Sequence, residues 1–111
     1  MLMLAACAST PPPTASLQAA QAAISNAERA DASRYAAGEL GEARTKLASA
    51  DTAVREERMI AAERLAEQSR AEAELASAKA AAAKAKAVND EMKRSTSTLI
   101  EEMQRSSGEK P

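Results

Sequence analysis

Residues 59–87, MIAAERLAEQSRAEAELASAKAAAAKAKA, decide the fold of this chain of 111 residues. Small or apolar residues recur there at alternating intervals of three and four, at positions 59, 62, 66, 69, 73, 76, 80, 83 and 87. A helix turns once in about 3.6 residues, so this seam occupies one helical face. The seam continues as Val88, Met92, Ser95 and Leu99. We therefore predict one long helix over residues 58–104 that frays through Ser95–Thr98.

Two shorter helices are predicted before the long one. The first spans residues 15–30, begins with Thr14 or Ser16 as its cap, and buries Leu17, Ala20, Ile24 and Ala27. The second spans residues 35–54, follows a linker in which Asp31 or Ser33 is the candidate cap, and buries Leu40, Ala43, Leu47, Ala50 and Val54. Acid–base pairs four residues apart, such as Glu42 with Lys46 and Asp90 with Arg94, are expected to form a solvated face.

The boundary between the second and third helices leaves two interpretations. Residues 55–58, Arg-Glu-Glu-Arg, contain no glycine or proline, so a continuous rod is possible. A turn is favoured because Glu57 falls on the apolar stripe of the second helix, while the next stripe starts out of phase at Met59. Adjacent acids also suit the positive N-terminus of a new helix. The fold predicted is all-α, an antiparallel helical hairpin or three-helix arrangement with a long C-terminal helix.

Composition excludes several kinds of function. The chain has 30 alanines, a single aromatic residue, Tyr35, and a net charge of -1, so neither a stacking surface nor a basic patch for nucleic acid is expected. It has no histidine and one cysteine, which argues against a metal site or an intramolecular disulfide. Narrow alanine packing leaves little volume for a pocket. We expect no enzyme activity, no small-molecule substrate and no cofactor.

The end of the long helix is a candidate interaction surface. Beyond about Ala80 no other helix of this short chain is available to cover it. Its apolar residues nevertheless keep helical spacing, and we predict partner binding by Val88, Met92, Leu99 and Ile100. The partner is expected to be another copy or a different protein.

Leu4-Ala5-Ala6-Cys7 resembles the lipobox of bacterial lipoproteins, in which cleavage precedes a cysteine that is then acylated. The resemblance implies a covalent acyl lipid on Cys7 and membrane attachment through it. Only three residues precede the motif, so we expect the translation start to lie further upstream. The domain organisation expected is a signal remnant with lipobox at 1–7, a proline-rich tether at 8–14, the helical domain at 15–105 and a disordered tail at 106–111.

A longer resemblance covers most of the chain, from about Leu17 to Ala87. It rests on Tyr35-Ala36-Ala37-Gly38-Glu39-Leu40 and on Leu65-Ala66-Glu67-Gln68 with the alanines around them. These residues are similar to the small alanine-rich helical lipoproteins of Gram-negative envelopes, a domain-of-unknown-function family. That family usually has Tyr-Ala-Pro-Glu-Glu-Leu at the first motif and a Gly-Asp-aromatic turn before the last helix, where this chain has Glu57-Arg58-Met59.

The resemblance implies an envelope role, often beside peptidoglycan-binding proteins of the outer-membrane-protein-A type. We expect a periplasm-facing lipoprotein of the outer membrane with a structural or scaffold role. The alternative is a self-assembling coiled coil, similar to the murein lipoprotein, that links the outer membrane to peptidoglycan. The two differ in oligomer symmetry and in whether the chain turns near Glu57.

Overall fold

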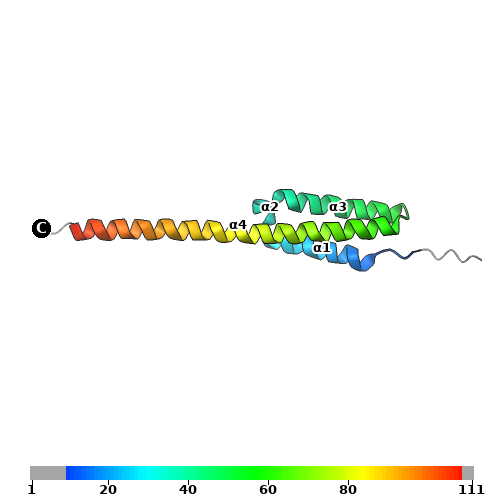
Figure 1. Cartoon of the computed structure of the whole chain (residues 1–111), viewed down its shortest axis with the longest axis horizontal. Coiled ribbons are helices and arrows are strands. Elements are labelled where there is room, and N and C mark those ends of the chain that lie inside the picture. Colours follow the sequence, from blue (N-terminus) through cyan, green and yellow to red (C-terminus); the bar gives the residue numbers. More distant parts are fainter. Residues whose placement is uncertain (1–9, 109–111) are drawn as a thin grey trace, which may run out of the picture.

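The described chain contains four helices: α1 (Thr14–Arg29), α2 (Ala32–Tyr35), α3 (Ala37–Arg55) and α4 (Met59–Gly108). The structure, a computed structural model, describes residues 10–108, and no strand occurs within them. α3 runs antiparallel to α4, and α1 runs in the same direction as α4 (Figure 1). The predicted all-α hairpin with a long C-terminal helix is confirmed.

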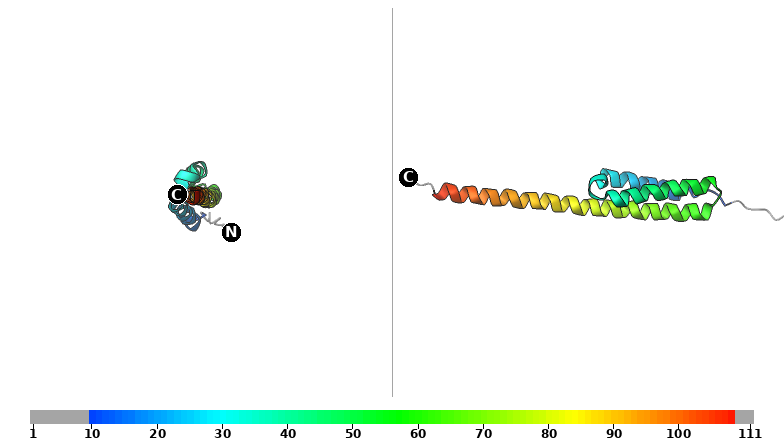
Figure 2. Two further views of the ribbon diagram at one scale, coloured as in Figure 1. Left: turned by 90° about the vertical axis from the view of Figure 1, so that its left-hand side faces the viewer. Right: turned by 90° about the horizontal axis from the view of Figure 1, so that it is seen from above.

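The core is built almost entirely from alanine. α4 lies between α1 and α3, which contact α4 more than they contact each other (Figures 1 and 2). Leu40 and Ile24 are the large side chains buried in it. The predicted seam of α4 is buried from its second position to Ala80, at Ala62, Ala66, Ser69, Ala73, Ala76 and Ala80. Because these side chains are small, the helices approach closely along it.

Beyond Ala80 the long helix continues without a neighbouring helix, and we call residues 81–108 the overhang (Figure 1). At 1.5 Å per residue the overhang is about 42 Å long. The seam prediction is wrong here, since Ala83 is only half-buried and Ala87 is exposed. Helical spacing alone does not bury a residue where α1 and α3 have ended.

The predicted fraying through Ser95–Thr98 is also wrong, because α4 stays helical to Gly108. The hydroxyls of Thr96 and Thr98 donate to carbonyls one turn back in the same helix, at 2.9 and 3.0 Å, and so do not compete with it. Residues 106–108, assigned to the tail, are helical as well, and the Ser107 hydroxyl likewise donates to the carbonyl of Met103 one turn back. The rest of the tail lies outside the described residues.

The turn between α3 and α4 is confirmed, and the continuous rod is wrong. The Arg58 N–H donates to the Ala53 carbonyl and the Glu57 N–H to the Val54 carbonyl. This pair of bonds is a Schellman motif, which ends a helix with one left-handed residue. Here that residue is Glu57, with φ 58°. A helix can therefore stop without glycine when its last carbonyls are satisfied in this way.

The predicted helix caps are wrong. Pro13 occupies the position before α1, so Thr14 lies inside the helix, and neither Thr14 nor Ser16 makes a capping bond. Asp31 precedes α2 in the left-handed conformation, with φ 62°, and makes no capping bond. The second helix starts at residue 37 rather than 35 because Ala36 leaves the helical region at φ -147°.

Candidate interaction surface

The residues predicted to bind a partner all lie on the overhang with their side chains in solvent. Val88, Met92, Leu99 and Ile100 are each at least half exposed. Met103 is 68% exposed and belongs with them, although it was not singled out from the sequence. Its position four residues after Leu99 is the signal that could have found it. We call these five residues the overhang stripe.

The overhang stripe is not the continuation of the buried seam. At about 100° per residue, the direct continuation of the seam passes through Lys84, Ala87, Glu91 and Thr98. The overhang stripe is turned from it by roughly a third of a turn. Its first part borders a shallow, mainly apolar depression lined by Ala81, Lys84, Ala85, Val88, Asn89 and Met92. The helix therefore has two distinct faces, one used inside the bundle and one left open.

Ion pairs hold the base of the overhang against the α2 end of the bundle. Lys84 Nζ lies 2.6 Å from a carboxylate oxygen of Asp31, and Lys79 pairs with Glu39 of α3. The bond from Lys84 lowers the pKa of Asp31, and the bond from Lys79 lowers the pKa of Glu39. Asp31 in turn raises the pKa of Lys84. All four groups reach solvent, so these pairs orient the overhang more than they stabilise the fold.

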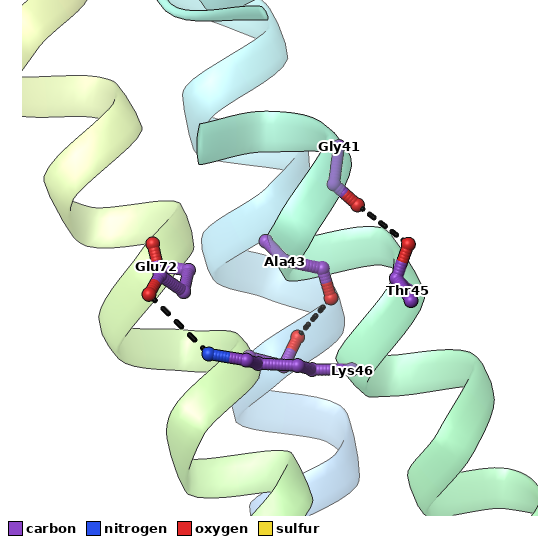
Figure 3. A network of polar contacts seen from close by, with 6 residues as sticks. Gly41, Ala43, Thr45, Lys46 and Glu72 are labelled. Atoms are coloured by element: carbon purple, nitrogen blue, oxygen red, sulfur yellow. Dashed lines mark hydrogen bonds and ion pairs between the residues drawn. The ribbon is translucent and has the colours of Figure 1, made fainter. Parts of the chain in front are cut away.

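Two polar contacts cross between α3 and α4 lower in the bundle. The Ser69 hydroxyl donates to the carbonyl of Ala43 at 2.7 Å, and the half-buried Lys46 Nζ lies 3.3 Å from Glu72 (Figure 3). The spacing predicted a pair of Lys46 with Glu42, but Lys46 pairs with Glu72 of the neighbouring helix instead.

The expected pair of Asp90 with Arg94 also does not form. Asp90 accepts from Lys86 at 2.8 Å, and Arg94 lies 3.6 Å from Glu91. A carboxylate in a helix has basic neighbours in both directions, so spacing alone does not determine its partner.

Tyr35, at the junction of α2 and α3, packs against the core and is half-buried. The Arg34 guanidinium carbon lies 5.2 Å from the centre of its ring. The aromatic ring therefore closes the end of the bundle next to the overhang.

The lipobox residues Leu4, Ala5, Ala6 and Cys7 lie outside the described residues. The described end of the tether, residues 10–12, lines one shallow pocket together with residues 57–61 at the start of α4. The tether and the overhang are therefore at opposite ends of the molecule (Figure 1). Within residues 10–108 none of the helices has the length and apolar character of a membrane span.

These features define an all-α protein made of an alanine-packed bundle and one projecting helix. Residues 15–92 match the family described as a domain of unknown function, DUF4398, and the chain belongs to that family. The matched segment takes in the bundle and the overhang as far as Met92. Searches of curated proteins and of solved structures found no match.

Proposed function

We propose that this protein is a periplasmic lipoprotein, anchored to the outer membrane through an acyl lipid on Cys7, with a non-catalytic scaffold role in the cell envelope. The observation that carries the proposal is the placement of its two ends. The tether meets the start of α4, whereas the overhang stripe lies at the far end of the same helix. The helix has 50 residues, which is about 75 Å at 1.5 Å per residue.

A rigid helix with this polarity is suited to presenting a binding surface away from a membrane. The ion pairs of Asp31 with Lys84 and of Glu39 with Lys79 fix its direction relative to the bundle. The overhang stripe supplies apolar area that a partner would remove from water. A second envelope protein, a peptidoglycan-associated protein or another copy of the chain would each suit this role.

The murein-lipoprotein-like alternative is less well supported. A continuous rod from membrane to cell wall has no need of the turn at Glu56–Arg58, which folds α3 back along α4. Because of the turn, α3 packs along the part of α4 near the anchor, and only the overhang has no helix beside it. The bundle with a projecting helix therefore favours a scaffold that presents a surface.

The anchor is tested by metabolic labelling. The gene is expressed with its natural upstream region in a Gram-negative host supplied with radiolabelled palmitate, and Cys7→Ser is compared with wild type. We expect label and outer-membrane fractionation for wild type and for a Ser9→Ala control, and loss of both for Cys7→Ser. Identical soluble fractionation of wild type and Cys7→Ser would contradict the proposal.

A further inference from the structure

A second repeat runs along the exposed side of α4, separate from the buried seam. Its members follow one another at strictly alternating intervals of four and three, and every one of them is exposed: Ala71, Leu75, Ala78, Ala82, Ala85, Asn89, Met92, Thr96, Leu99, Met103 and Ser106. This is a heptad pattern with Leu75 at an a position and Ala78 at a d position. We call these eleven residues the outer face.

We propose that the outer face pairs with the outer face of a second copy, in parallel and in register, as a two-stranded coiled coil. The repeat runs from residue 71 to residue 106, which is five heptads, and all of its a and d positions are apolar except Asn89, Thr96 and Ser106. This pairing names the partner of the overhang and so deepens the proposed function. Only the role of the dimer in the envelope rests on the proposed function; the pairing itself does not.

The bundle leaves the outer face free. In the same heptad frame every buried residue of α4, from Ala62 to Ala80, falls at a b or f position. Those positions lie on the side of the helix away from a and d. α1 and α3 therefore cover one side of α4, while Leu75 on the other side is 45% exposed. A second copy can approach along the whole repeat without displacing either helix.

The large apolar residues of the overhang gather on this side. Met92 and Leu99 stand at d, Met103 at a, and Val88 and Ile100 at the flanking g and e positions. The b, c and f positions of the overhang carry three of its four acids, its arginines and small or polar residues, and no large apolar residue, while the fourth acid, Glu102, stands at g. Burying the outer face would thus remove all five residues of the overhang stripe from water together.

Charge selects the parallel orientation. Lys79, Lys86 and Lys93 occupy successive e positions. In an antiparallel pair e residues face e residues, which would set lysine against lysine. In a parallel pair each faces a g residue of the second copy, here Glu74, Ala81 and Val88 respectively. The parallel pair therefore avoids setting lysine against lysine: it places Lys79, which already pairs with Glu39, near the Glu74 that pairs with Arg70, and the other two lysines beside aliphatic side chains.

Asn89 sets the register. It stands at an a position in the middle of the repeat and is exposed in the single chain. Two asparagines that meet at paired a positions donate and accept from each other, whereas an asparagine opposite an apolar residue loses those bonds. Only the in-register parallel arrangement places Asn89 opposite its counterpart.

The test uses cysteines placed at paired positions in the full chain, in a Cys7→Ser background. Ala82→Cys and Met103→Cys lie at a positions three heptads apart on the outer face, and Arg94→Cys and Glu101→Cys are exposed controls at f. Each variant is first shown by circular dichroism to keep wild-type helicity. Mild oxidation at micromolar concentration is followed by non-reducing electrophoresis. We expect about tenfold more disulfide-linked dimer at both a positions than at the controls, since paired a residues meet the short Cβ separation of a disulfide.

Equal linkage at a and f positions would overturn the proposal. So would linkage between Ala82→Cys at a and Leu99→Cys at d in a mixture with no linkage in either variant alone, because a faces d only in an antiparallel pair. A failure of this kind is distinguishable from a failure of the anchor, since the Cys7→Ser background carries no acyl lipid and palmitate labelling of wild type is measured separately.

Discussion

The hydroxyl of Ser69 donates a 2.7 Å hydrogen bond to the main-chain carbonyl of Ala43, which lies 26 positions earlier in the chain. Ser69 is fully buried and is the one polar residue buried in the described part of the chain. A side chain this short reaches the backbone of another helix only where the helices lie close together. The bond therefore reports the close approach that the alanine seam allows.

We predict that Ser69→Ala lowers the free energy of unfolding by about 1 kcal/mol, because a buried hydrogen bond is lost while the Ala43 carbonyl keeps its helical partner. Ser69→Leu should cost more, about 2 kcal/mol or above, because the seam has no room for the larger side chain. Urea denaturation measures both values. Ser95→Ala, exposed on the same helix, is the control and should not destabilise. Equal stability of Ser69→Leu and wild type would show that α3 and α4 are not in close contact.

Glu57 holds the left-handed conformation that ends α3, with φ 58°. A residue with a Cβ pays about 1 kcal/mol or more for it, whereas glycine does not. Glu57→Gly is expected to raise the unfolding free energy by about that amount. Glu56→Gly, at φ -87°, is the matched control and should give no gain. A destabilised Glu57→Gly protein would contradict the turn.

Acid should weaken the α2 end of the bundle. The pKa values of Asp31 and Glu39 are lowered from their ordinary values of 3.8 and 4.5 by bonds to Lys84 and Lys79. A carboxyl whose pKa is lower when folded stabilises the fold above its unfolded pKa and loses that contribution as pH falls through the folded value. Urea midpoints measured downward from pH 6 should therefore fall once the pH is below about 4.5.

Asp31→Asn should make this acid dependence shallower, because asparagine tolerates the left-handed conformation but carries no charge for Lys84. Asp51→Asn, exposed on α3, is the control. An unchanged acid profile for Asp31→Asn relative to Asp51→Asn would mean that the pair with Lys84 does not form in solution.

Asn89→Ile is predicted to tighten self-association by about tenfold or more while loosening its specificity, because a buried asparagine at an a position fixes register at a cost in stability. Sedimentation and the exchange of labelled chains measure the two effects. Ser97→Ile adds the same side chain at an exposed b position and should leave both unchanged. If Asn89→Ile associates more weakly than wild type, Asn89 does not lie in the interface.

Much of the fold follows from spacing. The seam at 62, 66, 69, 73, 76 and 80 is buried as predicted, and the phase break between Glu57 and Met59 located the turn. Caps were mispredicted because Pro13 occupies the position before α1, and because the Asp31 carboxylate pairs with Lys84, from a distant segment, and not with the backbone of α2. The seam prediction failed at Ala87 because periodicity does not reveal where the neighbouring helices end.

The exposed position of the candidate binding residues agrees with the prediction, and their binding of a partner stays a prediction. Val88, Met92, Leu99 and Ile100 do lie on the open overhang. The outer face was hidden, because alanine fills both sides of α4 and composition does not separate them. Only the burial of one side revealed that the other carries its own heptad repeat, with Asn89 at its centre.

Sedimentation equilibrium of the full Cys7→Ser chain tests most directly whether α4 carries a self-pairing surface. The account predicts a mass that rises with concentration toward twice the chain mass of 11.6 kDa. Val88→Asp combined with Leu99→Asp should return the chain to a monomer, while Thr98→Asp, exposed at a c position, should not. A mass of 11.6 kDa for the Cys7→Ser chain at every concentration up to about 0.5 mM would contradict the account.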